Sequence, residues 1–359
     1  KGLKFRTNFA LDGAVGTGRS FEIIVDRQIR ANPRNRLNRS YNEGYSLLSE
    51  YFLTYDRVFA NRHAINLVDG YTAQSFVSES FSAERQDFLN ESSEQRFLSV
   101  GTAITNATGG RAENSLVSGF SRLNYTLDDK YLFSATFRAD GSSRFAPGNR
   151  WGYFPAFSVG WRVSREEFFK NVDFISYLKL TGSWGQLGNQ NVPNLQYLAV
   201  ITANNRYVFN GQPVTGASQS RLADPNIQWE RAEMTNIGAE IGFLENRLLT
   251  NVNYFIKDTR DMLLAPPVLG TVGTAGIPNQ NVGSVRNQGL ELELTYQNRA
   301  TNNFTYSISG NAAFIRNEVT QLVDGGFLGS LRYGRPNEEI ARTFEGHPMA
   351  TFFGWRTNG

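Results

Sequence analysis

Residues 131–188 read YLFSATFRADGSSRFAPGNRWGYFPAFSVGWRVSREEFFKNVDFISYLKLTGSWGQLG, and three runs within them alternate strictly between apolar and polar residues. In the first run the odd positions from Phe133 to Ala139 are apolar, and the even positions from Ser134 to Asp140 are polar. Successive side chains of a strand point to opposite faces, so each run predicts a strand with one apolar face. Soluble strands sustain such alternation over about five or six residues. Because these runs last about ten or more, the length of a tilted membrane-crossing strand, the stretch predicts a transmembrane antiparallel β-barrel.

The composition agrees with a barrel. Charged residues make up 19% of the chain, while Phe and Tyr number 27 and 15, and strands and membrane girdles favour these aromatics. No apolar run approaches the ~18 residues of a transmembrane helix. Since only helices and closed barrels satisfy every backbone group in lipid, the barrel is the remaining membrane architecture.

The residue inventory offers little for catalysis. The chain has no cysteine and only two histidines, which excludes disulfides, thiolate ligands and a cysteine nucleophile. A net charge of +3 is too small and too evenly spread to indicate nucleic acid as a partner. His63 and His347 fall in predicted turns, where solvated side chains are the default interpretation. We therefore expect no enzyme activity, no cofactor and no metal site.

The connections alternate between short and long. Short turns are predicted near residues 61, 129, 245 and 301, and the S-x-x-E sequence at 164–167 predicts a short capped helix. Long polar loops are predicted at 14–46, 74–113, 188–228 and 265–282, with about twelve strands in total. This rhythm is typical of short periplasmic turns and longer extracellular loops. It argues against an extracellular β-sandwich, which alternation alone leaves open, and no even repeat indicates a propeller.

Several motifs in order resemble one known family. They are RADGSSRF at 138–145, WGYFPAFSVGWR at 151–162, LKLTGSWGQLGNQ at 178–190, NIGAEIGF at 236–243, NQGLELEL at 287–294 and EGHPMATFFGW at 345–355. Together they are similar to the barrel of SusC/RagA-type TonB-dependent transporters, the nutrient importers of the Bacteroidota outer membrane. The similarity covers nearly the whole chain, and the long loops contribute little to it.

The resemblance implies a larger parent protein. Residues 1–359 would be an interior fragment of one barrel domain of about twenty-two strands, incomplete at both ends. A plug domain and TonB box would lie upstream, and further strands would follow. The resemblance also implies a SusD-like surface lipoprotein over the extracellular face and coupling to the TonB complex. About twelve strands do not close such a barrel, so their outermost strands would be edges.

Candidate ligand-binding residues fall in two groups. The first is the charged set on the polar strand parity, which faces the lumen: Arg138, Asp140, Lys179, Glu240, Glu291 and Glu293. Hydrogen bonding between strands or docking of the plug is the favoured interpretation of this set. The second is the outer-loop aromatic set, which suits a glycan or a peptide but also suits loop packing: Tyr207, Phe209 and Tyr333. A further aromatic set on the apolar parity predicts an interfacial girdle beside lipid: Tyr131, Trp151, Tyr153, Trp161 and Trp184.

The predicted function is active, TonB-dependent import of oligosaccharides or oligopeptides across the outer membrane. A passive porin or a structural or adhesive barrel is the main alternative. An outer-membrane hydrolase would need a Ser/His or Asp/His cluster at the barrel rim. With two histidines, both in predicted turns, that alternative is disfavoured.

Overall fold

The structure is a computed structural model that describes residues 2–25, 32–266, 271, 276–301, 304–322, 328–332 and 339–354. Strands form nearly all of it, with short 3₁₀ turns at η1 (Ser93–Gln95), η2 (Pro147–Asn149), η3 (Val163–Arg165) and η4 (Glu167–Phe169). Within these residues, no helix has the length and apolar character needed to traverse a bilayer.

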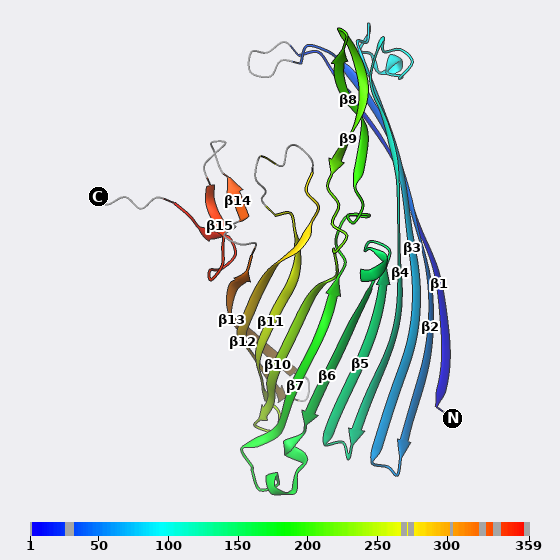
Figure 1. Cartoon of the computed structure of the whole chain (residues 1–359). Coiled ribbons are helices and arrows are strands. Elements are labelled where there is room, and N and C mark those ends of the chain that lie inside the picture. The colour runs from blue at the N-terminus through cyan, green and yellow to red at the C-terminus, as the bar shows by residue number, and fades with distance from the viewer. Residues whose placement is uncertain are drawn as a thin grey trace, which may run out of the picture. The chain divides into compact units, whose positions relative to one another are not determined.

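One large antiparallel sheet dominates the described residues (Figure 1). Its eleven strands follow the order β1-β2-β3-β4-β5-β6-β7-β10-β11-β12-β13. Their bounds are β1 (Leu3–Glu22), β2 (Arg36–Phe59), β3 (His63–Gln86), β4 (Ala103–Leu127), β5 (Tyr131–Ser142), β6 (Trp151–Trp161), β7 (Ile175–Asn189), β10 (Glu230–Phe243), β11 (Leu248–Leu264), β12 (Gln280–Thr301) and β13 (Phe304–Gln321). Apart from the inserted pair β8–β9, consecutive strands are neighbours, which is the up-and-down order that the predicted barrel requires.

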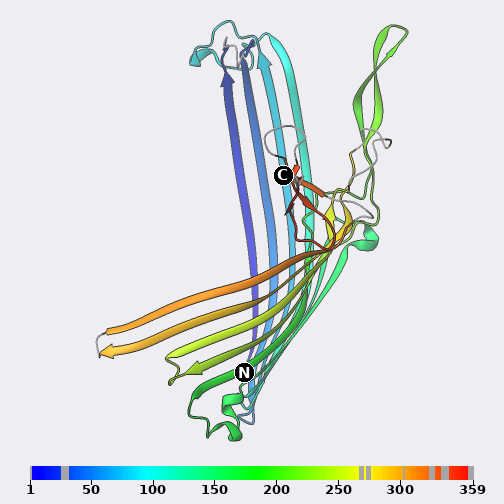
Figure 2. The same cartoon turned by 90° about the vertical axis from the view of Figure 1, so that its left-hand side faces the viewer.

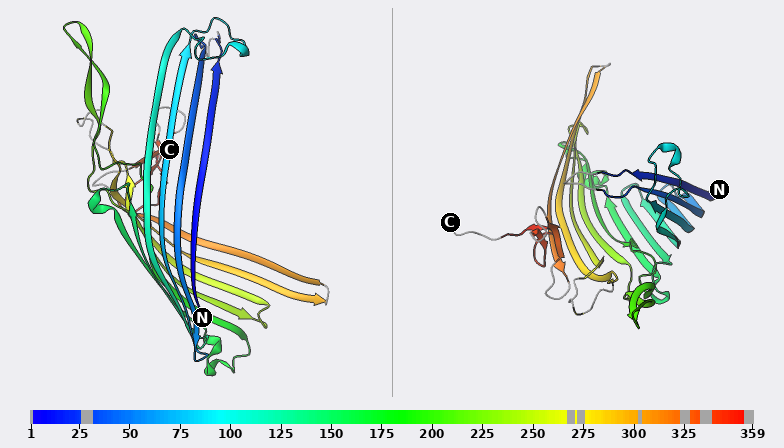
Figure 3. Two further views of the ribbon diagram at one scale, coloured as in Figure 1. Left: turned by 90° about the vertical axis from the view of Figure 1, so that its right-hand side faces the viewer. Right: turned by 90° about the horizontal axis from the view of Figure 1, so that it is seen from above.

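The chain divides into two compact units. The first comprises Lys1–Arg6, Phe52–Tyr71 and Ser118–Gly359, and the second comprises Thr7–Tyr51 and Thr72–Val117. Within the first unit, β5, β6, β7 and β10 to β13 form a curved wall when viewed along the strands (Figure 3). Short connections lie at one end of this unit's strands, at residues 60–62, 128–130 and 244–247 (Figure 1). The predicted alternation of short and long connections is therefore confirmed at these turns.

The turn at Asp128 and Asp129 shows why such connections are tight. Both residues have positive φ, 52° and 56°, and the Lys130 amide donates to the Leu127 carbonyl at 2.9 Å. Aspartate tolerates this left-handed backbone better than most residues. The Arg62 guanidinium also donates to both Asp128 carboxylate oxygens, at 2.6 and 2.7 Å.

Two of the predicted long loops are largely strand. Residues 14–22 continue β1, 36–46 belong to β2, 74–86 continue β3 and 103–113 begin β4. The prediction of loops at 14–46 and 74–113 was wrong because it relied on apolar alternation. Strand ladders continue wherever backbone groups pair, and the apolar alternation ends where both faces of a sheet are polar.

The predicted loop at 188–228 contains a hairpin of β8 (Val200–Phe209) and β9 (Gln212–Arg221). Its turn is Asn210–Gly211, with φ of 50° and 74°, the backbone that the Asn-Gly hairpin signal provides. The hairpin forms its own two-stranded sheet, and it projects beyond the ends of β7 and β10 (Figure 2).

Two smaller predictions also need correction. Of the about twelve predicted strands, the last was expected after residue 346, but the large sheet has eleven within the described residues. Instead β16 (Thr351–Phe352) pairs with β15 (Glu339–Thr343), which pairs with β14 (Leu328–Arg332) in a separate sheet. The expected capping box at 164–167 is replaced by η3 and η4, and neither has a side-chain cap hydrogen bond.

Three aromatic rings form a buried cluster in the first unit. The Trp229 ring centroid lies 5.2 Å from that of Phe145 and 5.5 Å from that of Phe154. All three are at most 6% exposed, and Trp229 Nε1 donates to the Arg150 carbonyl at 3.0 Å. A Cβ at Gly188 would lie 2.0 Å from the Phe154 ring, so the ring requires glycine there. The cluster ties β6 to the start of β10.

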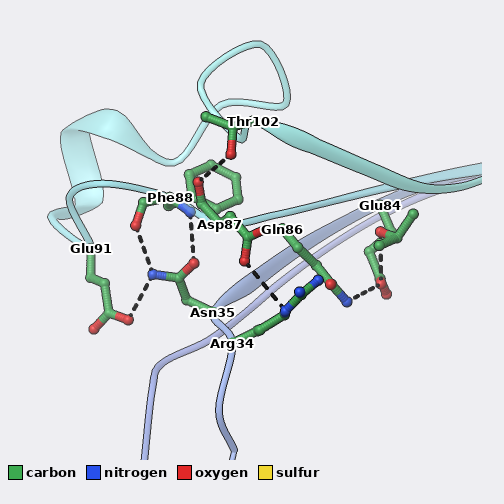
Figure 4. A network of polar contacts seen from close by, with 9 residues as sticks. Arg34, Asn35, Glu84, Gln86, Asp87, Phe88, Glu91 and Thr102 are labelled. Carbon is green, nitrogen blue, oxygen red and sulfur yellow. Dashed lines mark hydrogen bonds and ion pairs between the residues drawn. The ribbon is translucent and has the colours of Figure 1, made fainter.

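In the second unit, the buried side-chain amide of Asn35 joins two segments by hydrogen bonds (Figure 4). Asn35 is 2% exposed. Its Nδ2 donates to the Phe88 carbonyl at 2.9 Å and to Glu91 Oε1 at 3.0 Å, and its Oδ1 accepts from the Phe88 amide at 2.7 Å. The backbone of Phe88, which lacks a ladder partner, is thereby satisfied. Hydrogen bonds from the Ile24 amide and from Asn35 lower the pKa of Glu91.

Candidate solute-facing surface

The two faces of the first unit's sheet differ sharply. One row of paired residues crosses seven strands through Phe133, Val159, Gly182, Ile237, Tyr254, Leu290 and Phe314. Its large side chains are exposed, from 36% for Leu290 to 66% for Ile237. A neighbouring row on the opposite face pairs Ser134, Ser158, Ser183 and Asn236. An exposed apolar face behind a polar face is the arrangement of a barrel wall between lipid and lumen.

Arg138 and Asp140 lie on the polar face and bind each other. Arg138 Nε is 2.8 Å from both Asp140 carboxylate oxygens, and its Nη2 donates to Ser118 Oγ at 3.0 Å. Asp140 is 7% exposed and Ser118 is fully buried. The ion pair lies within β5 and holds the Arg138 guanidinium in place, and the hydrogen bond from Arg138 to Ser118 links β5 to β4.

The other charged candidates lie on β7, β10 and β12. Lys179 Nζ is 2.7 Å from Glu240 Oε1, and Asn253 Nδ2 donates to Glu291 Oε2 at 3.0 Å. Glu291 and Glu293 line a cavity of about 370 Å³ together with asparagine side chains. This part of the polar face is therefore acidic and rich in amides.

The fold and these faces agree with one known family. The sequence model described as "TonB dependent receptor-like, beta-barrel" matches residues 2–342.

The chain belongs to the TonB-dependent receptor β-barrel family.

Membership places the barrel in the outer membrane, in a family that is not enzymatic. The chain is 37% identical over 222 residues to the TonB-dependent receptor SusC of Bacteroides thetaiotaomicron, covering 61% of this chain and 22% of that protein. It is 28% identical over 365 residues to the TonB-dependent receptor P3 of Formosa agariphila, covering 100% of this chain and 36% of that protein. A solved structure titled "Structure of the RagAB peptide transporter" matches with a TM-score of 0.83 and 26% identity, covering 97% of this chain and 38% of that one. The SusC/RagA resemblance is confirmed, and the chain spans about a third or less of these two relatives.

Aromatic side chains with hydrogen-bonded polar edges lie on the apolar face of the receptor barrel. Near the short turns, Tyr131 Oη and Trp161 Nε1 donate to Glu166 at 2.6 and 3.1 Å. These bonds and that from Lys130 lower the pKa of Glu166. Farther along the strands, Trp184 Nε1 donates to Glu233 at 3.0 Å. Rings with an apolar body and a bonded polar edge suit the two membrane interfaces.

The outer-loop candidates lie apart from the cavities of the polar face. Tyr207 and Phe209 are on the β8–β9 hairpin and are 72% and 64% exposed. They line none of the cavities named here. Tyr333 lies outside the described residues.

Both histidines have aromatic neighbours. His63 Nδ1 is 2.8 Å from the Tyr125 hydroxyl at the short-turn end. The His347 ring centroid is 4.1 Å from that of Phe344. Among the residues that the structure describes, no group of acidic, histidine or cysteine side chains has the arrangement of a metal site.

A second cavity on the barrel's polar face was missed as a site by the sequence reasoning. It measures about 500 Å³ and includes Arg122 from β4 and Lys257 from β11 among its lining residues. The strand parity of each residue indicates the polar face. Their joint placement requires the pairing of all the strands between them, which no local motif encodes.

Proposed function

We propose that the chain forms part of the barrel of an active outer-membrane importer of the SusC/RagA type. In this proposal residues 1–359 are an interior portion of one barrel domain, and the plug domain and TonB box lie elsewhere in the protein. The solute is an oligopeptide or an oligosaccharide, energy comes from the TonB complex, and a SusD-like lipoprotein covers the extracellular side.

The observation that carries the proposal is the eleven-stranded sheet with an exposed apolar row on one face and polar cavities on the other. A wall of this kind suits the passage of a polar solute through a lipid-embedded barrel. Family membership and the likeness to a peptide transporter support the same interpretation. On this view the solute meets the polar face or the outer loops, where Tyr207 and Phe209 provide aromatic contacts.

The test is uptake by the native host with and without the full-length gene. Fluorescent oligopeptide and oligosaccharide mixtures are offered separately, and a protonophore is added to collapse the energy supply. We expect deletion to abolish uptake of one mixture and the protonophore to abolish it in the wild type. Uptake that depends on the gene but survives the protonophore would instead indicate a passive pore.

A SusD-like partner is tested in the same strain. An affinity tag on the full-length barrel protein should co-purify a surface lipoprotein in detergent. Recovery of the barrel protein alone would contradict the two-component part of the proposal.

A further inference from the structure

The cavity of about 500 Å³ on the polar face has an unbalanced charge. Arg122 and Lys257 are among its lining residues, and none of its lining residues is acidic. Neither cation has an ion pair or a side-chain hydrogen bond within the part of the chain that the structure describes. By contrast, Arg138 and Lys179 on the same face each bind a carboxylate.

This cavity is here called the basic trough. Its floor is low on β5, β6 and β7, because the residues there, Thr136, Ala156 and Gly185, are small. One paired row runs Thr136, Ala156, Gly185, Met234 and Lys257. With strands about 4.8 Å apart, the four steps from Thr136 to Lys257 span about 19 Å. A Cβ at Gly185 would lie 2.8 Å from Ala156 Cβ, so the close approach of β6 and β7 keeps the floor bare at its centre.

Hydroxyl and amide groups line the next row of the trough. Ser134 faces Ser158, Ser158 faces Ser183, and Asn236 donates to Ser183 Oγ at 3.2 Å. Hydroxyl groups and cations both donate hydrogen bonds to an anion. The trough therefore combines a smooth floor, neutral donors and two cations, at a volume within the ~300–1,000 Å³ of small-ligand sites.

The acidic cavity at Glu291 and Glu293 provides a contrast on the same face. It would repel an anion, whereas the basic trough would attract one, because like charges repel and opposite charges attract across a few ångströms. The polar face thus has an acidic cavity lined by β12 carboxylates and a basic one with cations from β4 and β11.

We propose that the basic trough binds carboxylate groups at Arg122 and at Lys257, one at each end. The inference rests on the proposed function, because it assumes that this face lines a solute path. Two sources provide the carboxylate: an acidic solute, or acidic side chains of the protein's own plug domain seated in the barrel.

The experiment uses the full-length transporter purified with its partner. The variants are R122Q/K257Q, the charge-conserving R122K/K257R, and R165Q as a control. Arg165 is a solvent-exposed cation that pairs with Asp129 at the short-turn end, away from the trough. Calorimetry measures binding of an alanine pentapeptide that carries two glutamates and of its glutamine counterpart. Thermal unfolding of the unliganded proteins is followed in parallel.

A solute carboxylate predicts that the wild type prefers the glutamate peptide and that R122Q/K257Q lowers this preference about tenfold, the effect of losing roughly 1.4 kcal/mol of charge-assisted hydrogen bonding. A plug carboxylate predicts no preference in the wild type and a lower Tm for unliganded R122Q/K257Q. In both cases R122K/K257R and R165Q should resemble the wild type. The trough assignment is overturned if R122Q/K257Q matches R165Q in both measurements, or if R122K/K257R fails as R122Q/K257Q does.

The proposed function fails separately. Absence of energised uptake in the wild-type host would refute the importer function. The thermal comparison would still decide whether carboxylates bind at the two cations.

Discussion

The assignment of the two sheet faces is tested by adjacent residues that point in opposite directions. Tyr254 is 43% exposed and lies in the apolar row between Ile237 and Leu290. Asn253 is its neighbour on β11 and faces the acidic cavity. An arginine at Tyr254 would enter lipid, and an arginine at Asn253 would meet carboxylates.

The depth of Tyr254 sets the size of the effect. Six residues at about 3.4 Å each separate it from Leu248, so it lies about 20 Å along the strand from the short-turn end. At a tilt of about 45° this is about 14 Å in depth, near the middle of an apolar band about 25 Å tall. Arginine on the lipid face at mid-depth costs about 2–4 kcal/mol, which is roughly a 100-fold loss in the folding constant.

The assay compares Tyr254→Arg with Asn253→Arg in the full-length protein. Each variant is unfolded by guanidinium in phospholipid bilayers, and its folded fraction in the outer membrane is measured by heat-modifiable migration. We expect Tyr254→Arg to lose about 2–4 kcal/mol. Asn253→Arg should lose less than about 1 kcal/mol, because the arginine replaces the hydrogen bond from Asn253 to Glu291 with a charge-assisted one. Equal losses, or a larger loss at Asn253, would refute the assignment of lipid and lumen faces.

Three further outcomes are expected. Asn35→Ala should leave the buried Phe88 amide unpaired, at a local cost of about 1–3 kcal/mol. The amide hydrogen of Phe88 should then exchange with solvent at least several-fold faster. An unchanged exchange rate would contradict the stabilising role of the Asn35 hydrogen bonds. Hydrogen bonds from Arg62 lower the pKa of Asp128, so the stability from this pair is present above the ordinary aspartate range and disappears as the pH falls through the lowered value. A Tm that is measured from neutral to acidic pH should therefore fall less in Asp128→Asn than in the wild type, and parallel curves would exclude this contribution. Phe154→Ala should destabilise the packing of Phe145 and Trp229 by about 3–5 kcal/mol. The loss should appear as protease cleavage between β7 and β10. Resistance equal to that of the wild type would argue against the aromatic cluster as the anchor of these strands.

The fold was predictable where lipid imposes a pattern on the sequence. Between residues 131 and 188 one side of each strand must be apolar and the other polar, so the period of two is visible in the chain. The parts of β1 to β4 within residues 14–46 and 74–113 were predicted as loops because their apolar alternation is weak, although their backbones pair in the same way. The β8–β9 hairpin carried a local signal in Asn210–Gly211 that the loop interpretation passed over.

The charged residues separate into two classes once their partners are known, and sequence parity alone does not make this distinction. Arg138 with Asp140 and Lys179 with Glu240 satisfy each other across or along strands, and breaking such a pair would expose its remaining charge on the sheet. Arg122 and Lys257 have no such partner among the described residues. Removing their charges would therefore leave the sheet's own hydrogen bonds intact. A change in solute preference or plug stability in these variants would report on what enters the lumen, whereas the same change at Arg138 would also report on a broken strand contact.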